Sequence, residues 1–224
     1  VNLQGSRGFR AALAHIEDAA SMVPCNPNTD GLMPFVLHLY KMQKPRILDA
    51  GFIMPVVAAR GPVCLAAFLR GVSEFMVDIV DHPGEAHHLL RITTQTVIDW
   101  LKAQAEAIGD TVEGILVLDD IVGFLSLRAY KEFAHPYLKQ ICDAFPAGWV
   151  KAYHNDANIR PFLSELPGCG FDVLNWSHKL DVAEVKAKTG GRMCLMGNVP
   201  PLDVGVRGAP GQVKESALEA LRKS

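Results

Sequence analysis

The sequence of 224 residues predicts an α/β fold, a (β/α)8 TIM barrel formed by a single domain over 1–224. Short, continuous apolar runs alternate with amphipathic segments, as repeated βα units require. Each run also ends in polar side chains, and the C-terminal ends of barrel strands converge on one mouth. The alternative is a doubly wound sheet, but no Gly-x-Gly-x-x-Gly pattern follows any run, so its nucleotide-binding form lacks its main signal.

The apolar runs predict parallel strands, because continuous apolar stretches of this length suit strands that are buried on both faces. The five runs cover 52–60, 114–120, 149–156, 171–178 and 192–198. A complete barrel takes about 250 residues. The chain is shorter, which leaves open a barrel that is incomplete at both termini of this sequence.

The segments between the runs carry the apolar spacing of helices. We expect helices at 85–108, 126–145, 159–166, 181–189 and 212–221. Pro83 leads into the longest of them and Gly109 stops it, while Ser126 can cap the next one. Residues 1–50 contain four prolines and predict an irregular lid segment, so the βα units are expected over 51–224.

Composition and charge exclude several classes of partner. The net charge is −2, from 22 Lys and Arg against 24 Asp and Glu, and no basic run occurs. Neither a nucleic acid nor a membrane is therefore an expected partner, and Arg60 interrupts the most apolar stretch, 51–69. Five scattered cysteines without a Cys-x-x-Cys pattern indicate reduced thiols, and no apolar run opens the chain as a signal peptide would. We expect a cytoplasmic protein.

The strongest chemical signal is Tyr153-His154-Asn155-Asp156 at the end of one apolar run. Strand alternation places the side chains of His154 and Asp156 on the same side. Asp119 and Asp120 end the preceding run, so neighbouring barrel strands would bring them alongside. An imidazole with carboxylates can bind a divalent metal with an open position, or can act as an acid–base pair.

Structural roles stay open for some of these residues. Asp119 or Asp120 can instead cap the following turn, and Asn155 can satisfy loop backbone groups. Trp176, near the end of the next run, suits either the core or a pocket wall. No Gly-x-Ser-x-Gly, P-loop or catalytic-cysteine pattern occurs, so hydrolase and phosphoryl-transfer chemistry have little support.

Several segments, in this order, resemble the uroporphyrinogen decarboxylase superfamily. Arg60–Gly71 is similar to its Gly-Pro-x-Thr-Leu element, and Leu118–Ser126 to its Asp-bearing strand with a following Leu-Ser. Phe133–Lys139 is similar to its Phe-x-x-Pro-Tyr-x-Lys helix, and His154–Asn158 to its His-x-Cys-Gly-Asn strand end. Phe171–Trp176 is similar to its Asp-Trp strand, and Leu195–Leu202 to its Gly-Asn-x-Asp-Pro turn. Each motif is modest alone, but the ordered series is specific and covers the chain from about Gly51 onward.

The resemblance implies a barrel and one of two chemistries. One is cofactor-free decarboxylation of uroporphyrinogen acetate groups; the other is methyl transfer to or from a corrinoid protein, with a zinc held by His-x-Cys and a later Cys. Phe68 stands at the decarboxylases' active-site Tyr position and lacks the hydroxyl, which argues against decarboxylation. His154 is retained from the zinc motif, Asp156 stands at its Cys position, and the later Cys would fall beyond Ser224.

The resemblance therefore implies an enzyme of the methyltransferase branch that acts on a small-molecule methyl donor or acceptor. A zinc ion would serve as Lewis acid, and cobalamin would be carried by a partner corrinoid protein. The expected catalytic residues are His154, Asp156 and Asp120, the expected zinc ligands are His154, Asp156 and Asp119, and the expected substrate-binding residues are Phe68, Asn155, Trp176 and Asn198. A decarboxylase-like lyase, a non-catalytic binding barrel and a homodimer stay open.

Overall fold

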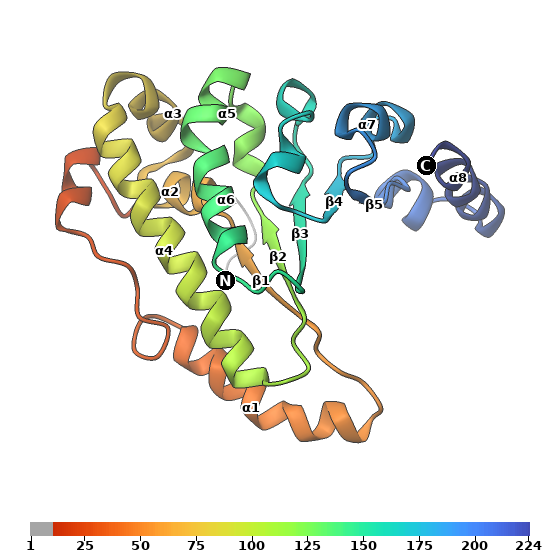
Figure 1. Ribbon diagram of the computed structural model, residues 1–224, viewed down its shortest axis with the longest axis horizontal. Coiled ribbons are helices and arrows are strands. Elements are labelled where there is room, and N and C mark those ends of the chain that lie inside the picture. Colours follow the sequence, from red (N-terminus) through yellow and green to blue (C-terminus); the bar gives the residue numbers. More distant parts are fainter. Residues whose placement is uncertain (1–10) are drawn as a thin grey trace.

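The computed structural model describes residues 11–224. The first ten residues lie outside the described part, and with them the start of the predicted lid segment and of the region where no signal peptide is predicted. One parallel sheet forms in the described part, with its strands in chain order (Figure 1). The strands are β1 (Val56–Arg60), β2 (Gly114–Leu118), β3 (Val150–Asn155), β4 (Val173–Trp176) and β5 (Cys194–Met196). A doubly wound sheet reverses its order at a switch point. The sequential order therefore confirms the βα succession of a barrel and rejects that alternative.

Helices follow the strands, as predicted for the segments 85–108, 181–189 and 212–221, whereas the helices Pro62–Arg70 and Val72–Asp81 were not predicted. The α-helices are α1 (Met33–Asp49), α2 (Pro62–Arg70), α3 (Val72–Asp81), α4 (Pro83–Ile108), α5 (Leu127–Phe133), α6 (His135–Asp143), α7 (Val182–Thr189) and α8 (Pro210–Lys223). Short 3-10 helices are η1 (Ile16–Ser21), η2 (Asp120–Phe124), η3 (Arg160–Phe162) and η4 (Leu166–Cys169), and η5 (Pro201–Val206) is a π-helix. The predicted cap Ser126 accepts a hydrogen bond from the Ala129 N–H, and α4 ends at Gly109, whose φ of +89° suits glycine.

Two predicted helices differ from the structure. The segment 126–145 forms α5 and α6 separately, because the backbone leaves the helical region at Ala134 and Pro136 has no N–H to continue the first helix. The segment 159–166 forms only the short helix η3 and the start of η4.

The predicted irregular segment 1–50 is wrong over its second half, because residues 33–49 form α1. Pro34 lies in the first turn of α1, where its missing N–H costs nothing, and Pro45 is accommodated inside the helix. The Tyr40 hydroxyl donates to the Gln104 side-chain oxygen at 3.2 Å, which ties α1 to α4. In residues 11–224, no helix is both long enough and apolar enough to cross a membrane.

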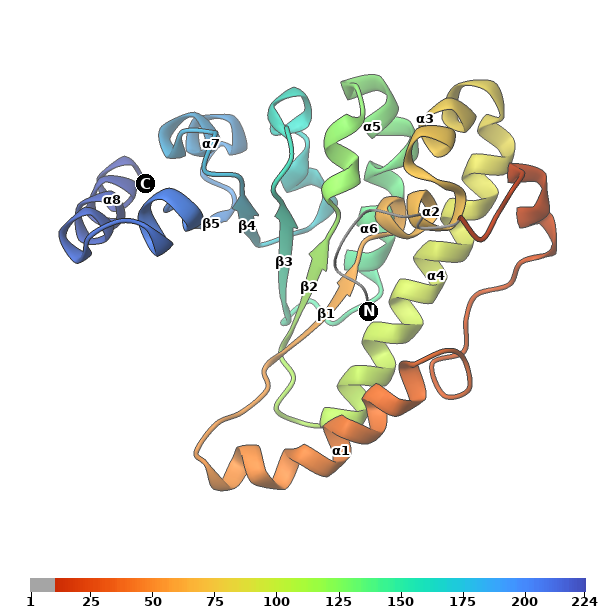
Figure 2. The same ribbon diagram turned by 180° about the vertical axis from the view of Figure 1, so that it is seen from behind.

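The two faces of the sheet have different surroundings. Val57 on β1, Val117 on β2, Tyr153 on β3 and Leu174 on β4 are buried in the hydrophobic core on the face that the helices cover (Figure 2). Strand alternation turns the intervening residues to the other face, which is more open in the described part. His154 lies on that open face.

Candidate active site

A row of side chains crosses the open face at the carboxyl ends of the strands. Backbone register pairs Arg60 with Leu118, Leu118 with His154, His154 with Asn175, and Asn175 with Met196. Parallel register with strict alternation puts these five side chains on one face. The polar members of the row are thus held by different strands, at the end where barrel enzymes carry their sites.

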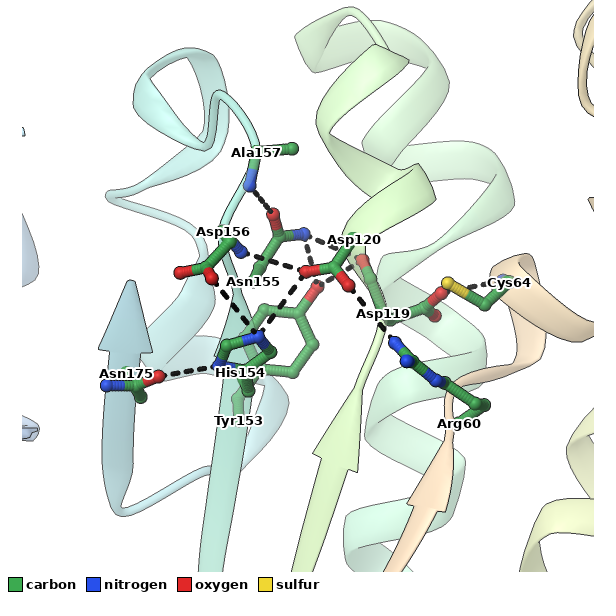
Figure 3. A network of polar contacts seen from close by, with 10 residues as sticks. All are labelled: Arg60, Cys64, Asp119, Asp120, Tyr153, His154, Asn155, Asp156, Ala157 and Asn175. Carbon is green, nitrogen blue, oxygen red and sulfur yellow. Dashed lines mark hydrogen bonds and ion pairs between the residues drawn. The ribbon is translucent and has the colours of Figure 1, made fainter. Parts of the chain in front are cut away.

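His154 is the centre of a polar cluster at this end of the sheet (Figure 3). Its Nε2 atom lies 3.6 Å from Asp120 Oδ1 and 3.8 Å from Asp156 Oδ2. Its Nδ1 atom is hydrogen-bonded to the Asn175 side-chain oxygen. The structure therefore brings together all three predicted catalytic residues, His154, Asp156 and Asp120.

The neighbours of Asn175 fix which ring nitrogen of His154 carries the proton. The Met196 backbone carbonyl can only accept, so the Asn175 group beside it is the amide N–H2, which donates to it. The other amide atom, the oxygen, can only accept, so His154 donates from Nδ1. In the neutral ring Nε2 is then an unprotonated acceptor that faces two carboxylates.

Asp120 is held by one contact from the end of β1 and one from the residue that follows β3. Its Oδ2 atom lies 3.1 Å from Arg60 Nη1, and its Oδ1 atom accepts a hydrogen bond of 2.9 Å from the Asp156 N–H. These contacts orient the carboxylate toward His154 while leaving it partly exposed. Asp156 has a side chain that is 65% exposed, so it can meet a ligand directly.

Asp119 does not join this cluster, which corrects its prediction as a metal ligand. Its side chain is fully buried and turned to the start of α2, where Oδ2 accepts from the Val63 N–H at 3.2 Å and Oδ1 from the Cys64 N–H at 2.7 Å. Burial raises the pKa of this carboxyl to about 7, against the opposing effect of the hydrogen bonds from Cys64 and Val63. The role is a cap, although on α2 and not on the turn that follows the strand.

Gly61 makes this cap possible. A β-carbon at Gly61 would lie 2.3 Å from the Asp119 carboxylate, so any larger residue would collide with it. The Arg-Gly-Pro sequence at the end of β1 therefore serves a packing purpose: Gly admits the carboxylate, and Pro62 opens the helix that the carboxylate caps.

Two predicted substrate-binding residues are buried on the helix side, which corrects both. Asn155 is fully buried, donates from its amide to the Asp119 backbone oxygen and the Tyr153 hydroxyl, and accepts from the Ala157 N–H. Trp176 is 2% exposed and donates from its indole N–H to the Leu180 carbonyl. Alternation accounts for both, since each residue follows a neighbour that faces the open side.

The other two predicted substrate-binding residues lie apart from His154. Phe68, on α2, lines a largely apolar cavity of about 510 Å³ between α2, α4 and the N-terminal segment, whose lining includes none of the polar cluster. Asn198 follows β5 and donates from its amide to the Leu180 carbonyl. Neither residue contributes to the polar cluster in the described part of the chain.

The residues do not fit the predicted zinc site. His154 Nε2 and the carboxylates of Asp120 and Asp156 are donor types that zinc accepts, but both Asp120 oxygens already take protein partners. Over residues 11–224, no group of three or more His, Cys, Asp or Glu side chains could hold a metal ion. Zinc binding stays a prediction that these contacts do not support.

Sequence reasoning missed Arg60 and Asn175 as site residues. Both occupy the register row with His154, one at the end of β1 and one within β4. The signal was in the sequence, because polar residues in otherwise apolar runs mark the open face of a sheet. Using it requires the strand register, which the sequence does not state.

Comparison with known proteins assigns the family. The family model described as uroporphyrinogen decarboxylase (URO-D) matches residues 8–224. This chain belongs to that family. Among curated members of the uroporphyrinogen decarboxylase family, the decarboxylase of Chlorobaculum tepidum is 31% identical over 145 residues and that of Chloroherpeton thalassium 32% identical over 152 residues. These matches cover 63% and 65% of this chain but only 39% and 40% of those proteins, so the chain spans about two fifths of the length of these relatives.

A solved structure supports the same family fold. A methyltransferase from Methanosarcina mazei superposes with a TM-score of 0.80 at 26% identity, covering 91% of this chain and 59% of that one. The superposition confirms the predicted barrel fold, and the described residues form five of its strands. Family membership and this neighbour support the prediction of an enzyme, while the names of the relatives divide between a methyltransferase and a decarboxylase.

Proposed function

We propose that this chain forms the reacting centre of a methyltransferase, which moves a methyl group between a small molecule and the cobalamin of a corrinoid protein. The observation that carries the proposal is the cluster of His154, Asp120 and Asp156 at the open carboxyl end of the sheet. The Methanosarcina mazei neighbour supports it, because it is a methyltransferase with the same fold. The corrinoid protein would dock over this end, and a homodimer stays a prediction.

The chemistry assigned to the cluster is proton transfer. When the methyl acceptor is a thiol, His154 Nε2 would take the thiol proton as the sulfur attacks the methyl carbon of methylcobalamin. The new S–C bond would replace the Co–C bond, whose electron pair would stay on the cobalamin, while Asp120 and Asp156 face the charged ring. With an ether-type donor, the C–O bond would break as the methyl group passes to the cobalamin, and protonated His154 would give its proton to the released oxygen. Asn175 keeps Nε2 free for this work by accepting the hydrogen bond from Nδ1.

A second candidate function is decarboxylation of uroporphyrinogen, which the names of the curated relatives favour. The charges of the site weigh against it. Uroporphyrinogen is a polycarboxylate, while the reacting end of this site carries two carboxylates, and its Arg60 is already paired with Asp120. Repulsion between like charges disfavours the placement of an acetate carboxylate at His154, beside Asp120 and Asp156.

Methyl-transfer and decarboxylation assays on the same protein test the proposal. We expect methyl transfer between methylcobalamin and a small thiol, followed by the absorbance change of the cobalamin. His154→Ala should lower its rate at least about 100-fold, and Asn175→Ala about tenfold through loss of the fixed tautomer. His38→Ala, which removes an exposed histidine on α1, is the matched control and should leave the rate unchanged. Full activity in His154→Ala, or uroporphyrinogen turnover without methyl transfer, would overturn the proposal.

A further inference from the structure

A second cavity adjoins the polar cluster and shares Asp156 with it. Its volume is about 340 Å³, and it lies between the loops that follow β3 and β4, at the carboxyl end of the sheet. It is lined by Asp156, Ala157, Asn158, Arg160, Ser177, Lys179 and Leu180. Its position beside the reacting residues suits the part of a substrate that does not react.

Hydrogen-bond donors without a protein acceptor gather in this cavity. Ser177 is only 7% exposed, and its side-chain oxygen accepts from the Lys179 N–H, so the hydroxyl proton is left to donate. The Asn158 side-chain oxygen accepts from the Arg160 N–H, which leaves the amide N–H2 as the other free donor. Within residues 11–224, no hydrogen bond from either donor group to the protein is found. Ser177 is buried and Asn158 is exposed, so a ligand with acceptor atoms would complete the hydrogen bonds of both.

The charges around the cavity point to an anion. Arg160 forms a two-point pair with Glu184, with contacts of 2.8 and 2.9 Å, so its charge is already balanced. Lys179 also lines the cavity, is exposed, and has no carboxylate within ion-pair distance in the described part of the chain. It is therefore the cationic lining residue whose charge is not balanced by a carboxylate. Asp156, on the side toward His154, carries the opposite charge.

From these donors and charges we infer that the cavity binds an oxyanion group, a carboxylate or phosphate, on the small-molecule substrate. Ser177, Asn158 and Lys179 supply the hydrogen bonds, and repulsion from Asp156 keeps the oxyanion at the Lys179 end. The uncharged, reacting end of the substrate then lies toward His154. This assignment of a substrate class rests on the proposed function, since it takes His154 as the reacting end.

Binding of inorganic phosphate to the full chain, measured by titration calorimetry at low ionic strength, tests the inference. We expect saturable binding that weakens roughly tenfold in Lys179→Met and several-fold in Ser177→Ala. Lys188→Met is the matched control: it removes the same charge from an exposed position on α7, and it should bind phosphate as the unmodified chain does. Asp156→Asn should strengthen binding, because it removes the repelling charge.

The outcomes separate this inference from the proposed function. Phosphate binding requires no turnover, so a chain that binds phosphate through Lys179 but transfers no methyl group would sustain the cavity assignment and refute the reaction. Unchanged binding in Lys179→Met, equal losses in Lys179→Met and Lys188→Met, or no saturable binding at all would overturn the inference. Retained folding of each variant, checked by its melting temperature, keeps these comparisons valid.

Discussion

Asp119 and Asp120 are neighbours in the chain, yet they belong to opposite sides of the sheet. Asp119 turns toward the helices, is fully buried and caps α2. Asp120 turns toward the open face and lies 3.6 Å from His154. Both follow β2 directly and are the same chemical group. The difference between them comes entirely from the direction in which the end of one strand presents each side chain.

The comparison shows that, at this end of the sheet, polar groups that stabilise the fold lie on the buried face and the candidate catalytic groups lie on the open face. The buried side satisfies its polar groups inside the protein: Asp119 accepts two backbone N–H groups, and Asn155 donates to the Asp119 carbonyl. The open side leaves His154 and Asp156 with accessible polar atoms. A buried polar group without hydrogen-bond partners lowers the stability of the fold. Only the open side can therefore hold polar groups that are free to bind a ligand.

Removing each carboxylate in turn is the sharpest test of this division. Asp119→Ala leaves two buried N–H groups without an acceptor, so it should lower the free energy of unfolding by about 3 kcal/mol. Asp120→Ala removes a partly exposed ion pair and an exposed hydrogen bond from the Asp156 N–H, and it should lower the free energy of unfolding by no more than about 1 kcal/mol, while slowing methyl transfer. Urea denaturation measures both values. Equal losses of stability would show that the two sides are not divided as described.

Crowding the buried side should have the next largest effect. Gly61→Ala places a β-carbon 2.3 Å from the Asp119 carboxylate, which should lower the free energy of unfolding by about 2 kcal/mol. Gly148→Ala is the matched control, because a β-carbon at that position would meet no atom within 4 Å. The melting temperatures of the two variants report the contrast. A Gly61→Ala protein as stable as the Gly148→Ala protein would contradict the close approach.

The pH dependence of stability gives the most gradual effect, a slope of at most about 1.4 kcal/mol per pH unit. Burial raises the pKa of Asp119 from 3.8 to about 7. Between these values the unfolded chain releases a proton that the folded chain keeps, so this residue makes stability fall as pH rises from about 4 to about 7. In Asp119→Asn that contribution disappears, and its unfolding free energy should fall less steeply over the range. Parallel curves from denaturation at several pH values would contradict the raised pKa.

Sequence patterns predicted the strands well because the buried runs of this sheet are continuous and apolar. The same alternation that placed His154 and Asp156 together also puts Asn155 on the other face, so that correction was within reach of the sequence. Trp176 needed the register of β4 against β3. Asp119 could not be assigned, because its partners on α2 are 55 and 56 residues away in the chain.

The residues assigned to the site only through the family resemblance are not part of the polar cluster, whereas His154 and Asp156, assigned through strand geometry, are. Phe68 and Asn198 lie apart from His154, because helix packing and the chain after β5 determine where they point. The break between α5 and α6 was likewise visible in the sequence as Pro136, but an apolar stripe that continues across a break resembles one long helix. Local patterns thus located the elements, and tertiary contacts determined the site.

The row of residues that spans the sheet links the chemistry of one side chain to the alignment of a distant strand. The Met196 carbonyl orients the Asn175 amide, and that amide selects the protonated nitrogen of His154. β5 is only three residues long and touches no reacting group, yet its position determines which nitrogen of the imidazole ring can accept a proton. A slip of β5 by one residue would remove this carbonyl and let the ring exchange its two tautomers. The shortest strand of the sheet therefore fixes the tautomer of His154, the proposed base.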